Sequence, residues 1–187
     1  MPLETWALMV SFIAMALIIS SYFWGSKSGF LLFQSLGILF LMASYLLDKQ
    51  YFATIGLAIG LARALVFFVY EKRGKTASIG WSILFALGTI STYFIVNIGI
   101  LRTAKIEDII YLVALVLYAF IFRIQNIECM RYMVTIPTAL AILYNVLCGA
   151  TSFVVISYVF ELAASLVAIL HYHVFVEKQS VNKGERI

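Results

Sequence analysis

The chain has 187 residues, of which 64% are hydrophobic and only 12% are charged, and its formal net charge is +4. A soluble globular chain is about 45–50% apolar and about 25% charged. This composition excludes a water-soluble domain, because too little polar surface is available to cover it. The basic residues lie in short clusters between apolar runs, which argues against a nucleic-acid partner and indicates a membrane topology.

Seven apolar runs follow one another along the chain, and most are close to the roughly 20 residues that cross a bilayer as a helix. The first is interpreted as a retained helix, because no basic segment of a signal peptide precedes it. The fifth is the weakest, since Arg123 must extend toward the interface for this run to span. The fold class predicted is an all-α integral membrane protein with seven transmembrane helices in the lipid bilayer, and the runs cover residues 5–24, 29–47, 51–70, 77–97, 109–123, 130–148 and 151–175.

Lysine and arginine are distributed unevenly between the two sides of this topology. The side that includes the N-terminus carries three of them, Lys49, Arg102 and Lys105. The other side carries nine, which are Lys27, Lys72, Arg73, Lys75, Arg123, Arg131, Lys178, Lys183 and Arg186. Because cytoplasmic loops are enriched in basic residues, the N-terminus is predicted outside the cell and the C-terminus in the cytoplasm.

A weak internal repeat appears when the chain is shifted by about 99 residues. The shift places Phe23 on Phe122 and Tyr45 on Tyr144, and it aligns the polar turns of the two halves. Identities are few and any two apolar stretches align somewhere, so the repeat depends mainly on the spacing of turns. One additional crossing between two three-helix units would give both units the same orientation in the membrane.

The repeat predicts a 3+1+3 arrangement, in which two parallel three-helix bundles are joined by a linker helix. The corresponding boundaries are 1–75 for the first bundle, 76–105 for the linker transmembrane helix, 106–176 for the second bundle and 177–187 for a cytoplasmic tail.

Two stretches, SYLLDKQYFATIGLAIGLARALVFFVY at 44–70 and LYNVLCGATSFVVISYVFELAASLVAI at 143–169, carry a family resemblance. They resemble the YgjV-type bacterial inner-membrane proteins, which have a triple-helix repeat like that of the SWEET and PQ-loop transporters. The resemblance implies a bacterial inner-membrane location, and Arg63 stands where this family's arginine is expected. It implies a fold more firmly than a function. The chain departs from the wider superfamily because it has no Pro-Gln dipeptide, and symmetric proline hinges are therefore not expected.

Arg63 and Glu161 are the two charged side chains that fall well inside the predicted spans. A charge at the bilayer centre costs at least about 2.5–3.5 kcal/mol, so both are expected to face the interior of the bundle. They are predicted either to form a buried ion pair between the halves or to face one polar cavity. A substrate or ion site and a purely structural clamp both remain open. The resemblance adds that SWEET-type transporters line their substrate pocket from the third helices of their repeats.

Five further residues are candidates on weaker grounds. Tyr45, Tyr144 and Asn145 lie near the predicted outer ends of the second and sixth helices, where they could rim a vestibule or simply mark the interface. Gln34, deeper in the second helix, is expected to bond another helix or to line the cavity. Pro137 should kink the sixth helix, either as a hinge or as a static bend.

No cofactor, metal site or catalytic residue is predicted, and the chain is not expected to be an enzyme. His171 and His173 are two positions apart, which is unsuitable for a metal site on a helix. The small residues Gly56, Gly60 and Ala64 form one helix face and are interpreted as a packing surface. The predicted function is ATP-independent transport of a small polar solute by alternating access. The alternative is a non-transporting membrane scaffold or partner subunit.

Overall fold

The computed structural model describes residues 3–47, 49, 51–100, 105–149 and 152–171. Within these ranges the chain forms seven α-helices and one π-helix, without β-strands, which confirms the predicted all-α class. The predicted tail at 177–187 lies outside the described residues. The helices are α1 (Leu3–Tyr22), α2 (Lys27–Leu47), α3 (Tyr51–Lys72), α4 (Ile79–Thr92), η1 (Tyr93–Ile100), α5 (Ile106–Ile121), α6 (Ile127–Leu147) and α7 (Ser152–His171).

Six segments of the described chain are long and apolar enough to cross a membrane, which makes the protein polytopic. One of them combines α4 with the π-helix η1, which together cover Ile79–Ile100. The remaining helix, α5, has 16 residues and is the shortest of the candidates predicted from the sequence. Its length of about 24 Å falls short of a bilayer core about 30 Å thick.

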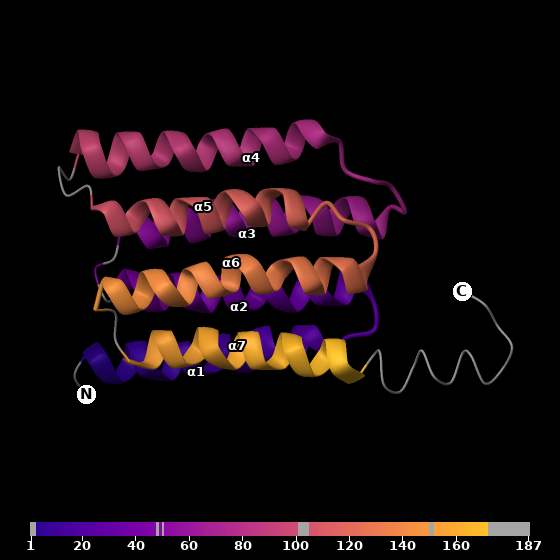
Figure 1. The fold of residues 1–187 in the computed structure, drawn as a ribbon, viewed down its shortest axis with the longest axis horizontal. Coiled ribbons are helices and arrows are strands. Elements are labelled where there is room, and N and C mark those ends of the chain that lie inside the picture. Colours follow the sequence, from indigo (N-terminus) through magenta and orange to yellow (C-terminus); the bar gives the residue numbers. More distant parts are fainter. Residues whose placement is uncertain (1–2, 48, 50, 101–104, 150–151, 172–187) are drawn as a thin grey trace, which may run out of the picture.

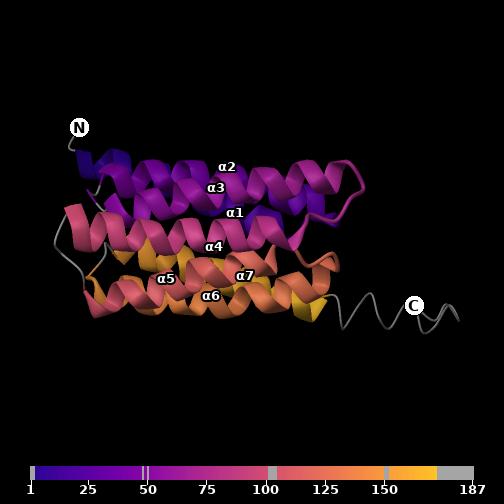
Figure 2. The same ribbon diagram turned by 90° about the horizontal axis from the view of Figure 1, so that it is seen from above.

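The helices lie side by side in two layers, one formed by α1, α2 and α3 and the other by α5, α6 and α7 (Figure 1). Within each layer the middle helix, α2 or α6, packs against both of its neighbours. The layers meet where α1 contacts α7 and where α3 contacts α5. Helix α4 contacts α3 and α5, and Figure 2 shows it running along the edge between the two layers.

Two helices begin three residues earlier than the hydrophobic pattern indicates, and the residues at their starts explain this. The Asn126 side chain accepts hydrogen bonds from the backbone N–H groups of Glu128 and Cys129, at 2.8 and 3.1 Å, so α6 begins at Ile127 rather than at residue 130. Helix α5 begins at Ile106 rather than at 109, with two acidic residues in its first turn. Acidic side chains are favourable there because they complement the helix dipole.

Close approach of α3 to α5 depends on a glycine. A Cβ atom at Gly56 would lie 2.7 Å from Cδ1 of Leu115, which is closer than van der Waals contact permits. Ala64, two turns further along α3, is completely buried. Gly56 and Ala64 therefore pack as this helix face was interpreted, whereas Gly60, between them, lines a cavity.

Large apolar side chains cover the outside of the bundle. The α4–η1 segment is the most exposed candidate span, and it presents Leu84, Leu87 and Ile95 with more than half of each side chain accessible. Outward-facing apolar residues of this kind require a hydrocarbon solvent, so they support membrane insertion of the bundle.

Candidate functional site

A cavity of about 40 Å³, called the central cavity from here on, lies between the two helical layers. Its lining comes from α1, α2, α3, α5, α6 and α7, whereas no described residue of α4 contributes. At roughly 10–15 Å³ for each water, this volume holds about three water molecules. Six polar side chains line it among apolar neighbours, and they are Gln34, Arg63, Tyr111, Tyr118, Tyr158 and Glu161.

Arg63 projects from α3 toward α5 and is buried, with an exposed fraction of 3%. Its Nη1 donates a hydrogen bond of 3.0 Å to the backbone carbonyl of Leu115. The guanidinium also lies over two aromatic rings of α5, with 5.5 Å to the centroid of Tyr118 and 4.9 Å to that of Phe122. The Nε atom is buried without a hydrogen-bond partner. The cation is therefore held by a carbonyl dipole and two ring faces, and it keeps an unused donor.

Glu161 projects from α7 toward α1 and is also buried, with an exposed fraction of 5%. Its Oε1 accepts a hydrogen bond of 2.9 Å from the hydroxyl of Tyr22. Gln34 lines the same cavity from α2, and its Nε2 donates to Oγ of Ser21 on α1 at 3.1 Å. Gln34 thus combines the two roles considered for it, since it bonds another helix and lines the cavity.

Arg63 and Glu161 do not bond each other, so the buried ion pair considered above is not formed. In the described part of the chain, the ion pairs join Lys27 to Glu71 at 3.1 Å and Arg131 to Glu128 at 2.8 Å. The geometry matches the second alternative in that both charges line one cavity, although most of its lining is apolar. The physical reason is that each charge has closer polar partners on the neighbouring helix of the other layer.

The residues predicted to rim a vestibule lie inside the bundle. Tyr45 and Asn145 are completely buried, and the Tyr45 hydroxyl donates to Oδ1 of Asn145 at 2.9 Å, which joins α2 to α6. Tyr144 stacks on Tyr111 of α5 with ring centroids 4.6 Å apart. These contacts close the bundle on the side of the α2–α3 and α6–α7 connections, so in this structure the three residues lie inside the bundle and rim no vestibule.

Pro137 is buried within α6, and the helix continues through it from Ile127 to Leu147. The next residue, Thr138, forms a hydrogen bond of 2.8 Å with the hydroxyl of Tyr118 on α5. A proline here removes one backbone hydrogen bond, and the packed surroundings fit a static bend as well as a hinge.

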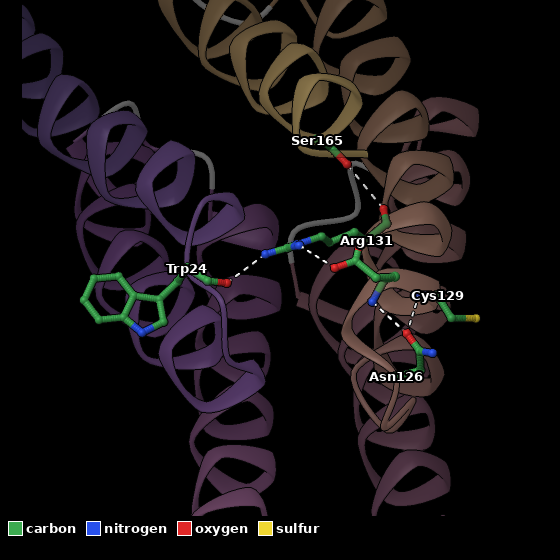
Figure 3. A network of polar contacts seen from close by, with 6 residues as sticks. Trp24, Asn126, Cys129, Arg131 and Ser165 are labelled. Atoms are coloured by element: carbon green, nitrogen blue, oxygen red, sulfur yellow. Dashed lines mark hydrogen bonds and ion pairs between the residues drawn. The ribbon is translucent and has the colours of Figure 1, made fainter. Parts of the chain in front are cut away.

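The end of the bundle that carries the α1–α2, α3–α4 and α5–α6 connections is called the basic end, because Lys27, Lys72, Arg73, Lys75, Arg123 and Arg131 gather there. Arg131 joins the two layers at this end, as Figure 3 shows. Its Nη2 donates to the backbone carbonyl of Trp24 at 2.7 Å, and its Nη1 donates to Glu128. Oγ of Ser165 in turn donates to the Arg131 carbonyl at 3.3 Å.

A larger cavity of about 390 Å³ opens at the basic end, between the two layers. It is bordered by Tyr22 and Gly25 on one side and by Glu128, Arg131 and His171 on the other. Tyr22 therefore has this cavity on one side, while its hydroxyl bonds the Glu161 carboxylate that lines the central cavity.

Sequence reasoning did not identify Tyr22, Tyr118 or Arg131 as site residues. Arg131 was assigned to a connection, although Asn126 as a helix cap would have placed it in the first turns of α6. The tyrosines carried no comparable signal, because aromatic residues near the ends of apolar runs are common in all membrane proteins. In the described part of the chain, no group of three metal-ligating side chains occurs.

No protein-family model, curated protein or solved structure matches this chain. The fold and the cavity therefore define its class by themselves. It is an all-helical, multi-pass membrane protein with two oppositely charged side chains buried at one small cavity between its layers.

Proposed function

We propose that this protein transports a small polar solute across the membrane by alternating access, without ATP. The observation that carries the proposal is the central cavity, which both layers line and which receives the buried Arg63 and Glu161. Placing charges in a membrane interior is costly, and such residues commonly mark solute or ion pathways. No nucleotide-binding motif occurs in the sequence, so the proposed mechanism uses the gradient of the solute or of a coupled ion.

The 3+1+3 arrangement of two parallel bundles is part of this proposal, with α4–η1 as the linker and α5 as a short seventh span. The contacts between the layers support it. Exchanging the two bundles replaces α1 by α5 and α3 by α7, and this exchange converts the α1–α7 contact into the α3–α5 contact. The two charges follow the same relation, since each projects from the third helix of one bundle toward the first helix of the other.

Alternating access requires that the cavity be closed on each side in turn. The Tyr45–Asn145 hydrogen bond and the Tyr111–Tyr144 stack close it on one side. On the other side, Tyr22 bonds Glu161 and borders the larger cavity at the basic end. Opening on that side requires the Tyr22 hydroxyl to leave Glu161 and the Arg131 guanidinium to leave the Trp24 carbonyl. Because a cavity of about 390 Å³ already lies between the layers there, we place the easier opening at the basic end.

The proposed location is the bacterial inner membrane, with the basic end in the cytoplasm and the N-terminus outside. The excess of lysine and arginine at that end supports this orientation. The resemblance to the YgjV-type proteins supports the location, and membership of that group is part of the proposal.

A scaffold or partner subunit is the second candidate function, and one observation favours it. Each buried charge already has a partner on the neighbouring helix, Leu115 for Arg63 and Tyr22 for Glu161. Two such contacts could dock the layers permanently, with a cavity that only holds water.

Solute flux into proteoliposomes separates the two candidates. Vesicles containing the purified chain are mixed with hyperosmotic glycine, glycolate, ethanolamine or ethylene glycol, and their reswelling is followed by light scattering. A transporter should accelerate reswelling for at least one of these probes, and the Gly60→Leu variant, which fills the cavity, should abolish the acceleration. Reswelling no faster than in protein-free vesicles for every probe would favour the scaffold.

A further inference from the structure

We propose that the central cavity recognises a small zwitterion, with its carboxylate at Arg63 and its ammonium group at Glu161. This inference rests on the proposed function, because it names the class of solute that the same site would bind. It is carried by the placement of two opposite charges on different walls of a single cavity.

The charge balance of the cavity selects this class of ligand. Arg63 and Glu161 are the only charged residues among its described lining, and they are not paired with each other. A ligand with a single negative charge would compensate Arg63 but meet the like charge of Glu161, and a simple cation would do the reverse. A neutral polyol would leave both charges without a counter-charge. A zwitterion supplies both signs at once, which is the electrostatic complement of the site.

Both charged groups retain hydrogen-bonding capacity for such a ligand. Arg63 uses Nη1 for the Leu115 carbonyl, whereas its buried Nε has no partner. Arginine binds carboxylates through pairs of N–H donors along one edge of its planar guanidinium group. A carboxylate would therefore supply the hydrogen-bond acceptor that the buried Nε–H of Arg63 lacks. A carboxylate accepts about four hydrogen bonds, and Glu161 receives one from Tyr22 at Oε1. The Gln34 side chain is a second hydrogen-bond partner of Glu161. The lone pairs that remain suit an ammonium group with three donors.

The surroundings limit the size of the ligand. The cavity of about 40 Å³ is smaller than an amino acid, so binding requires an expansion. A second cavity of about 10 Å³ adjoins it and shares four lining residues with it, Glu161, Ile18, Leu41 and Tyr158. Tyr22 bonds Glu161 and borders the cavity at the basic end. Displacement of the Tyr22 hydroxyl by the ligand ammonium group would join these spaces on the Glu161 side. The smallest zwitterions should therefore bind best.

Four probes of similar size test the charge requirement directly on the purified full-length chain in nanodiscs. Glycine carries both charges, glycolate replaces the ammonium group by a hydroxyl, ethanolamine replaces the carboxylate, and ethylene glycol lacks both. Binding is measured by equilibrium dialysis and by the shift in melting temperature. Glycine should bind at least about tenfold more tightly than each of the other three. Equal binding of glycolate or ethanolamine, or no binding of glycine, would overturn the inference.

Variants assign the binding to the site. Arg63→Lys keeps the positive charge and should weaken glycine binding by less than Arg63→Met does, and Glu161→Gln should remove the preference for glycine over glycolate. If these changes prevent folding, Gly60→Leu serves instead, because a Cβ at Gly60 meets only Nη2 of Arg63, at 3.5 Å. Gly60→Leu should abolish glycine binding in a folded protein, and unchanged glycine binding would refute the assignment.

The flux measurement tests transport and the binding measurement tests the zwitterion, so each proposal can be contradicted without the other. Flux of a singly charged or neutral probe without glycine binding would contradict the zwitterion and leave transport standing. Glycine binding without flux of any probe would support the site and contradict transport.

Discussion

The hydroxyl of Tyr22 donates a hydrogen bond of 2.9 Å to Oε1 of Glu161, and this contact joins the first and last helices of the described bundle. Both groups are buried, so the bond satisfies a carboxylate that has no ion-pair partner within the described residues. Tyr22 also borders the cavity at the basic end, and Glu161 lines the central cavity.

Replacement of Tyr22 by Phe tests how much this hydrogen bond contributes to the stability of the fold. We expect the melting temperature in detergent to fall, because a buried acceptor that loses its donor costs about 1–3 kcal/mol. Differential scanning fluorimetry measures the change. Tyr51→Phe is the matched control, since Tyr51 is exposed at the start of α3. Equal melting temperatures for the two variants would mean that the Tyr22 hydroxyl is not needed at Glu161.

A charge swap, Arg63→Glu combined with Glu161→Arg, tests whether the two charges act as a pair. The Leu115 carbonyl and the rings of Tyr118 and Phe122 present negative surfaces to position 63. A carboxylate there is repelled, so the double variant should be no more stable than the Arg63→Glu single variant. Thermal unfolding of both single variants and the double variant gives the interaction free energy between positions 63 and 161. Recovery of stability in the double variant would indicate a direct ion pair instead.

Gly56→Ala tests the close packing of α3 on α5. The added methyl group would lie 2.7 Å from Cδ1 of Leu115. We therefore expect Gly56→Ala to be less stable than Gly88→Ala, because both variants gain about 1 kcal/mol of helix propensity and only Gly56→Ala must displace a packed side chain. Gly88→Ala on α4 is the control, because a Cβ there meets no atom within 4 Å. The melting temperatures of the two variants are compared in detergent. A Gly56→Ala variant as stable as the Gly88→Ala variant would argue against the packing described for this face.

Arg131→Gln tests the link between the layers at the basic end. The substitution removes the charge-assisted hydrogen bond to the Trp24 carbonyl, and a bond of this kind should contribute about 1.5–3 kcal/mol. Hydrogen exchange of the α1–α2 turn should therefore become at least about tenfold faster. Lys75→Gln, at an exposed position of the same end, should leave this exchange unchanged. If both variants exchange alike, Arg131 does not hold the turn.

The sequence predicts the helices well, because apolar runs of sufficient length are a direct consequence of the solvent they require. It misplaces the start of α6 because the hydrophobic pattern gives no weight to Asn126, whose capping bonds extend the helix toward the connection. It identifies Arg63 and Glu161 because an intramembrane charge is costly wherever its partner lies.

The partners of these charges could not be predicted in the same way. Tyr22 and the Leu115 carbonyl become partners only through the α1–α7 and α3–α5 contacts, which depend on how the two layers dock. Tyr45 and Asn145 were expected at a rim because they lie near helix ends. They are buried because α2 and α6 face each other between the layers at that depth.

Access to position 60 from the two sides of the membrane is the most direct test of transport through the central cavity. Gly60→Cys is introduced after Cys129 and Cys148 are replaced by Ser, and right-side-out and inverted vesicles are treated with a membrane-impermeant thiol reagent. An alternating-access transporter should expose the thiol introduced at position 60 to the reagent in both orientations, whereas Gly88→Cys on α4, which lines no described cavity, should react in neither. Protection of the position-60 thiol in both orientations would contradict transport through this cavity.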